Sequence, residues 1–313
     1  MVKYRPITTI IIEVLLLVLC SFSFFLNWLS FGKLKKGKKK PLLSIPNTSA
    51  LNKVSVVIAI KNEARYIGKT IRNLESTTVD KSRVQIILVD CGGKDNSIDV
   101  AKASIGSIPL RVIKVPSSHG RGYSFNSGAD IADGDLLLFL RADSLVPPGY
   151  DETLRRELSS HNVHMTAFKF SFDSPAAIAD PFSSVKALSI VRIYQNLMST
   201  VCKLPRGSQG LAVTHDFFQT NKFPSDVVLL EDVGFVSAAR RVLLTCGGSE
   251  GGIRILEQSV LSSPEEAVKV GVLQHTLINV LAFSLRHFFR VSDETIYRWC
   301  YVRLPKCLKN VKV

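Results

Sequence analysis

Charged side chains recur at one kind of place in this sequence, directly after apolar runs that have the character of buried strands. They occur at Lys61-Asn62-Glu63, at Asp90, in the loop 117–121 that ends in Arg121, and at Arg141-Ala142-Asp143. Carboxylates such as Glu63 and Asp90 accept hydrogen bonds from ribose hydroxyls or base N–H groups, whereas Arg121 and Arg141 are suited to pairing with phosphates. The combination indicates a nucleotide that carries a diphosphate, bound with or without a divalent cation.

The elements that position these residues are strands and helices in alternation. Continuous apolar runs predict strands at 54–60, 84–89, 110–115 and 135–140, and helical spacing predicts helices at 63–76, from about 97, and at 122–132. Such alternation is typical of an α/β fold with a parallel sheet covered by helices on both faces. Parallel sheets of this kind bind ligands outside the carboxyl ends of their strands, which is where the charged residues lie. We therefore expect a ligand site at that edge.

The sequence lacks the motifs of several common nucleotide and metal sites. No GxGxxG follows the first strand and no GxxxxGK[ST] occurs in the chain, so neither a dinucleotide fingerprint nor a P-loop is indicated. The 6 cysteines show no CxxC spacing and the 6 histidines no HExxH spacing. This pattern argues against a zinc site or a disulfide framework and suits a reducing compartment.

Six of the lysines that contribute to the formal net charge of +14 lie at 33–40, directly after a membrane-like segment. Residues 7–31 are mostly apolar, with Glu13 as their only charge, and are about as long as the ~20 residues that cross a bilayer. A lysine-rich stretch follows at 33–40. The positive-inside rule then places the rest of the chain in the cytoplasm, and anionic headgroups would attract the lysines. We expect a single-pass membrane anchor, with a cleaved signal peptide as the alternative. A nucleic-acid module is disfavoured because the charge is concentrated beside this segment.

The sequence divides into an anchor with its lysine-rich flank (1–40), a linker (41–53), one globular domain (54–260) and a helical C-terminal extension (261–313). Within the domain, 164–173 alternates like a strand and 185–203 reads as a helix. Residues 265–290 predict a long amphipathic helix, whose apolar face is suited to core packing or, alternatively, to contact with a bilayer surface.

Five segments in this order resemble family 2 glycosyltransferases, which have the GT-A fold. They are "VSVVIAIKNEARYIGKTIRNLE", "IILVDCGGKDNSIDVAK", "GRGYSFNSGADIADGDLLLFLRADSLVPPG", "GSQGLAV" and "LLEDVGF". The resemblance runs from about residue 54 to residue 302. Within the family, the chain resembles the branch of radical-SAM/selenodomain-associated glycosyltransferases. It implies a Rossmann-like, mostly parallel sheet with helices on both faces, following the N-terminal transmembrane helix.

The resemblance also implies roles for individual residues. Glu63 and Asp90 would hold the nucleoside, Asp143 would bind Mn²⁺ or Mg²⁺ on the donor diphosphate, and Asp232 would be the general base. Arg121 and Arg141 would face the phosphates, and the acceptor side would contain Ser208, Gln209 and Glu231. Such an enzyme transfers a sugar, with inversion, from a nucleotide-diphosphate-sugar to the hydroxyl of an acceptor, here a lipid, a small molecule or a glycan.

Two departures from the family pattern keep alternatives open. Arg141 stands where an aspartate would complete the DxD motif, and Ser208 replaces the aspartate of the branch's Gly-Asp-Gln loop. The same fold could therefore serve a non-catalytic nucleotide-sugar-binding or scaffold protein. Asp232 has a further interpretation, because carboxylates in the first turn of a helix also stabilise the helix dipole. A sugar nucleotidyltransferase would need a glycine-rich loop after the first strand, which "IAIKNEA" does not supply.

Overall fold

The computed structural model describes residues 52–160, 163–173, 181–225, 230–246 and 252–265, and, further on, 268, 278–282, 285, 291–296, 298 and 299. The predicted membrane segment 7–31, its lysine-rich flank and nearly all of the linker lie outside these residues, as does most of the predicted helix 265–290. Within the described part of the chain, no helix combines the length and the apolar character that a bilayer crossing requires.

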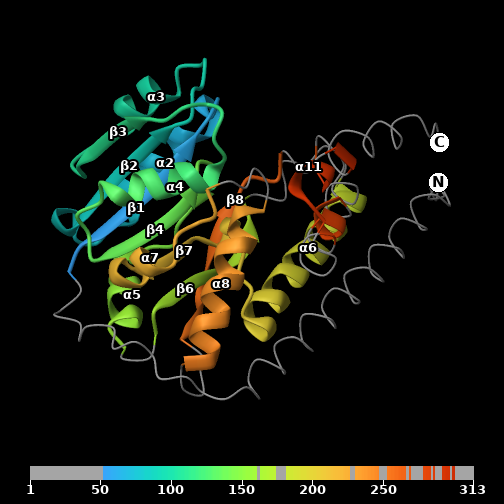
Figure 1. Cartoon of the computed structure of the whole chain (residues 1–313). Coiled ribbons are helices and arrows are strands. Elements are labelled where there is room, and N and C mark those ends of the chain that lie inside the picture. Colours follow the sequence, from blue (N-terminus) through green and yellow to red (C-terminus); the bar gives the residue numbers. More distant parts are fainter. Residues whose placement is uncertain are drawn as a thin grey trace.

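One mixed sheet forms the centre of the molecule (Figure 1). Its strands are β1 (Val54–Ile60), β2 (Val84–Asp90), β3 (Leu110–Lys114), β4 (Leu136–Arg141), β5 (Ser144–Leu145), β6 (Met165–Phe172), β7 (Leu211–Thr214) and β8 (Ile253–Ser262), in the spatial order β3-β2-β1-β4-β7-β6-β8-β5. The predicted parallel arrangement is confirmed for β3-β2-β1-β4.

The sheet is mostly parallel, as predicted, because β6 and β8 pair parallel and run in the same direction as β4, but β5 and β7 run in the opposite direction. Strand β7 runs antiparallel to both β4 and β6, and β5 runs antiparallel to β8. These two strands are short, and a buried apolar run of four residues does not reveal its direction in the sequence. The sheet is therefore mixed, as is common in larger α/β folds.

Helices cover both faces of this sheet. They are α2 (Ala64–Thr77), α3 (Ser97–Ser104), α4 (Arg121–Asp130), α5 (Tyr150–Leu158), α6 (Pro181–Cys202), α7 (His215–Thr220), α8 (Glu231–Cys246) and α11 (Asp293–Ile296). Alternate residues of β1 enter different cores, because successive strand side chains point to opposite faces. Val57 packs in the core that includes residues of α4, α6, α7 and α8, and Ile58 packs in the core that includes residues of α2, α3 and α5.

Helix α4 lies unusually close to the strands beneath it, and this places its first residue, Arg121, at the sheet edge. A Cβ atom at Gly128 would come within 2.4 Å of Val57 Cγ1 and 2.9 Å of Val89 Cγ2. Only glycine permits this approach, so Gly128 fixes the height of α4 above β1 and β2.

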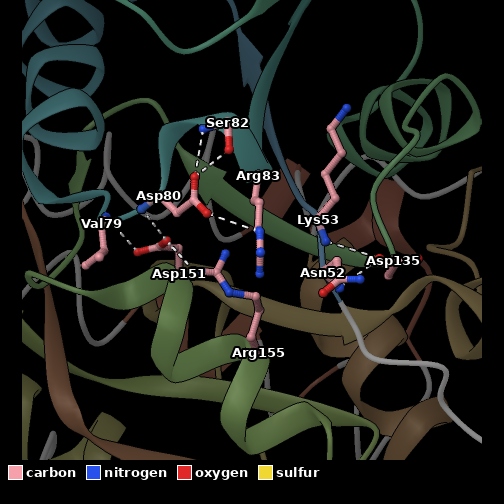
Figure 2. A network of polar contacts seen from close by, with 9 residues as sticks. All are labelled: Asn52, Lys53, Val79, Asp80, Ser82, Arg83, Asp135, Asp151 and Arg155. Carbon is pink, nitrogen blue, oxygen red and sulfur yellow. Dashed lines mark hydrogen bonds and ion pairs between the residues drawn. The ribbon is translucent and has the colours of Figure 1, made fainter.

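A polar network ties α5 to the segment before β2 (Figure 2). Asp151 is fully buried and accepts hydrogen bonds from the backbone N–H groups of Val79 (3.1 Å) and Asp80 (3.2 Å) and from Arg155 Nη2 (2.7 Å). A buried carboxylate is tolerated when donors satisfy it in this way. Nearby, Asp135 accepts hydrogen bonds from the backbone N–H groups of Asn52 and Lys53, which fixes the start of β1 beside β4.

Candidate functional site

A cavity of about 530 Å³ opens at the carboxyl ends of the parallel strands. Its charged wall contains Lys61, Glu63, Arg121, Arg141, Asp143 and Asp232. Lys61 and Glu63 follow β1, Arg121 begins α4, and Asp143 follows β4. The structure thus brings together charged residues that are spread widely along the chain, as the strand-end rule predicts.

Asp90 lies at the end of β2, paired with Ile60 of β1, and is only 8% exposed. Its Oδ1 accepts hydrogen bonds from the backbone N–H groups of Gly92 (3.1 Å) and Gly93 (3.0 Å). The next residue, Cys91, lines the cavity. Asp90 therefore shapes the turn that forms this part of the wall.

Asp143, the expected metal ligand, is engaged at both carboxylate oxygens. Arg141 Nε donates to Oδ1 at 3.2 Å, and Ser262 Oγ donates to Oδ2 at 2.8 Å. Ser262 was not indicated by the sequence, because it reaches the site only through the pairing of β8 with β5, which sets Ser262 opposite Ser144.

The predicted metal site contains one protein carboxylate, that of Asp143. Across the residues that the structure describes, no group of three or more His, Cys, Asp or Glu side chains could hold a metal ion. Mg²⁺ is commonly bound by one or two carboxylates together with substrate phosphates. Asp143 therefore fits a cation that a donor diphosphate helps to hold, and it does not form part of a preformed protein cage.

Glu231 and Arg121 form an ion pair at the start of α8. Arg121 Nη1 lies 3.2 Å from Glu231 Oε1, and only 9% of the glutamate side chain is exposed. Burial raises the pKa of Glu231 and the neighbouring Asp232 carboxylate raises it further, although the charge of Arg121 opposes the shift. The pair links the phosphate-facing side of the cavity to its acidic side.

Asp232 is held as an anion by several donors. Its Oδ2 accepts a hydrogen bond from the Gly207 N–H (2.8 Å) and lies 3.7 Å from Arg206 Nε, while Oδ1 accepts from the Val233 N–H (2.8 Å). Burial alone would raise the pKa of Asp232, but Arg206 and the two backbone donors outweigh it and hold the pKa below its usual range. Asp232 is therefore ionised at neutral pH. The sequence reading missed Arg206, although it directly precedes the "GSQG" motif.

The two residues of the 207–210 loop that were expected at the acceptor side have different environments. Ser208 lines the cavity and donates a hydrogen bond to Gln195 Oε1 of α6 (3.1 Å). Gln209 is fully buried, and its Nε2 donates to Phe168 O (2.9 Å) and Ser199 Oγ (3.0 Å). Because its amide group is hydrogen-bonded within the fold, Gln209 holds the loop in position. It is not among the described residues that line the cavity.

Comparison with known sequences gives a consistent match for the first part of the domain. Residues 55–182 match the family model described as Glycosyl transferase family 2. The "Uncharacterized glycosyltransferase alr2836" of Nostoc sp. is 34% identical over 97 residues, which are 31% of this chain and 30% of that protein. The "Uncharacterized glycosyltransferase YwdF" of Bacillus subtilis is 25% identical over 176 residues, which are 56% of this chain and 63% of that protein. The chain thus spans less than two thirds of the length of either relative.

Solved structures share the fold at low sequence identity. The mannosyltransferase PcManGT from Pyrobaculum calidifontis, in complex with GDP-Man and Mn²⁺, has a TM-score of 0.54 at 13% identity, covering 95% of this chain and 83% of that one. Residues 1–349 of S. aureus TarS, in complex with UDP, give a TM-score of 0.52 at 16% identity, covering 83% and 76%. Assignment to the radical-SAM/selenodomain-associated branch stays a prediction. The described chain therefore has a mixed α/β fold of the GT-A type, and its residues 55–182 are similar to the Glycosyl transferase family 2 model.

Proposed function

We propose that this protein is a glycosyltransferase that moves a sugar from a nucleotide-diphosphate-sugar donor to an acceptor hydroxyl with inversion. The observation that carries the proposal is one cavity in which Arg121 and Arg141 lie on the same wall as the acidic pair Glu231-Asp232. The family 2 match and the relatives named as glycosyltransferases support it. Two proteins of similar fold bind UDP or GDP-Man, which supports a donor of that chemical class.

The donor side would be formed by the strand ends. Lys61, Arg121 and Arg141 supply positive charge for the diphosphate, and Glu63 and Asp90 would accept hydrogen bonds from the nucleoside. Positive charge at this place stabilises the transition state, because negative charge develops on the leaving phosphate as the bond to the anomeric carbon breaks. A divalent cation shared between Asp143 and the diphosphate would add to this stabilisation.

The acceptor side would be formed by Asp232. The acceptor hydroxyl must lose its proton as its oxygen attacks the anomeric carbon, and an ionised carboxylate within reach can accept that proton. Attack in a single displacement, opposite to the departing diphosphate, inverts the anomeric centre. The low pKa of Asp232 ensures that the base form is present at neutral pH. Proton transfer to a positioned carboxylate typically accelerates such a step by about 10² to 10⁴.

The test begins with a panel of nucleotide sugars, scored by the rise in unfolding temperature that ligand binding causes. With the donor identified, Asp232→Asn should lower kcat for transfer or donor hydrolysis by at least about 100-fold while the donor Kd stays unchanged. Asp143→Ala should abolish turnover and remove any increase in donor affinity caused by Mn²⁺, as measured by calorimetry. The matched control is Asp216→Asn, an exposed carboxylate in the first turn of α7, which should have no effect.

Two outcomes would contradict the mechanism. Wild-type activity in both Asp143→Ala and Asp232→Asn would show that neither residue acts as proposed. Donor binding without transfer or hydrolysis, across many acceptors and with or without Mn²⁺, would favour a non-catalytic nucleotide-sugar-binding protein. The observation that favours this second candidate is the Arg141–Asp143 ion pair, which occupies one oxygen of the expected metal ligand.

A further inference from the structure

The cavity has a second half that the charged residues do not explain. Beyond the acidic pair, its wall is formed by Phe170 and Phe172 of β6, by Val191, Tyr194 and Met198 of α6, and by Leu204. Several of these side chains are almost wholly buried in the fold, for example Phe170 at 3% and Met198 at 4% exposed. The apolar wall, as we call these six residues, is therefore an inner lining of the cavity and differs from an exposed surface patch.

The apolar wall is built as a fixed surface. Asn196 of α6 joins the helix to β6, because its Oδ1 accepts from the Phe170 N–H (2.8 Å) and its Nδ2 donates to Phe170 O (2.9 Å). The rings of Phe170 and Phe172 pack edge to face with centroids 4.8 Å apart. Val191, Tyr194 and Met198 follow helical spacing and so share one face of α6. A ligand would meet a preformed surface, which lowers the entropic cost of binding.

Hydrogen bonds connect this wall to the proposed base. Gln195, on the same face of α6, accepts from Ser208 Oγ (3.1 Å), and the neighbouring Gly207 N–H donates to Asp232 Oδ2 (2.8 Å). The apolar wall therefore begins next to the carboxylate that would activate the acceptor. A molecule whose hydroxyl is at Asp232 has two directions in which to extend, toward the arginines or along the apolar wall.

We propose that the apolar wall binds the body of the acceptor, and that the acceptor is an alcohol attached to an aliphatic chain. This inference rests on the proposed function and adds the class of acceptor to it. The donor diphosphate requires the cationic half of the cavity, so the acceptor body is left with the apolar half. A polyhydroxylated acceptor would turn most of its hydroxyl groups toward hydrocarbon and thioether side chains, since Tyr194 is the one member of the apolar wall with a hydroxyl group, and hydroxyls buried without partners are costly. An aliphatic chain gains affinity there, because burial of apolar surface is favourable.

The experiment uses the protein with saturating donor nucleoside diphosphate and the probes glycerol, 1-butanol, 1-hexanol and 1-octanol, with binding measured by calorimetry. The Kd should fall by about fourfold for each methylene that becomes buried, and glycerol should not bind. With the intact donor, the same order should appear in KM for transfer to these alcohols or in their inhibition of donor hydrolysis.

Two variants on α6 form a matched pair. Val191→Asp places a charge in the apolar wall and should weaken 1-octanol binding by more than tenfold. Ile193 is 60% exposed and does not belong to the apolar wall, so Ile193→Asp should leave 1-octanol binding unchanged. Phe172→Ser, at a partly exposed position, gives a second test should Val191→Asp fail to fold. In each folded variant the affinity for the nucleoside diphosphate should stay at the wild-type value.

The outcomes separate this inference from the proposed function. If the donor binds and is hydrolysed but affinity for the alcohols does not depend on chain length, the apolar acceptor is refuted and the proposed function stands. Equal weakening in Val191→Asp and Ile193→Asp would also refute it, since the alcohols would then be bound by exposed apolar surface. If no nucleotide sugar binds at all, the proposed function is refuted, and the apolar acceptor, which rests on it, is refuted with it.

Discussion

At the scale of single residues, Arg206 sets the charge state of the proposed base. Its guanidinium lies 3.7 Å from Asp232 Oδ2 and is the strongest of the groups that lower the pKa of Asp232. A base with a lowered pKa is active above that pKa, and its activity is lost as the pH falls through it. In Arg206→Gln the pKa of Asp232 should rise, so the acidic limb of kcat/KM against pH should move to higher pH. The acidic limb of kcat/KM reports the pKa of an essential group in the free enzyme, so the position of the limb can be compared directly between variants.

The control is Arg192→Gln, which removes an exposed arginine of α6 and should leave the acidic limb in place. An unshifted limb in Arg206→Gln would assign the limb to a different group, most directly to Glu231, whose burial raises its own pKa. Because Glu231 and Asp232 are adjacent carboxylates, their protons titrate as a pair. The direction of the shift in Arg206→Gln is therefore the informative quantity.

Single residues also show what can be predicted from the sequence. Glu63, Arg121 and Asp143 were predicted to meet because each follows a strand of the parallel part of the sheet, and the structure brings them to one cavity. Ser262 could not be found in this way. Its contact with Asp143 depends on the register of β8 against β5, which involves residues more than one hundred positions apart and leaves no local pattern.

At the scale of elements, the network around Asp151 holds α5 against the start of β2 (Figure 2). In Asp151→Ala, Arg155 and two backbone N–H groups lose their buried partner, and the free energy of unfolding should fall by about 3 to 5 kcal/mol. The control Asp133→Ala breaks an exposed ion pair with Lys53 and should cost less than about 1 kcal/mol. Urea unfolding with an unchanged m-value would measure both. Equal losses in the two variants would show that the buried network has no special role.

The elements were predictable where packing imposes a pattern. Strands β1, β2 and β4 are buried on both faces, so their apolar runs are continuous and their positions were predicted almost to the residue. Strands β7 and β5 carry too few residues to show a period, and their antiparallel direction depends on how the chain returns to the sheet after α6 and after β4. The parallel strands β1 to β4 were therefore predictable, whereas the two reversed strands β5 and β7 required the structure.

At the scale of the whole molecule, we propose that the predicted segment 7–31 anchors the protein in a membrane with the glycosyltransferase domain facing the cytoplasm. An aliphatic acceptor of the kind proposed above is itself concentrated in a bilayer, so anchorage would bring the apolar wall to its substrate. The lysines of 33–40 would add attraction to anionic headgroups, and this attraction is screened by salt.

The full chain should therefore float with phospholipid vesicles and resist extraction by high salt, because insertion of an apolar segment of this length does not depend on charge. A chain lacking residues 1–40 should stay in the soluble fraction. Replacing the lysines of 33–40 with glutamine should reduce the preference for anionic over neutral vesicles but leave salt-resistant binding intact. Release of the full chain by salt would show that it binds only peripherally. Vesicle binding by the truncated chain would instead place a second membrane contact beyond residue 40, for which the amphipathic pattern of 265–290 is the candidate.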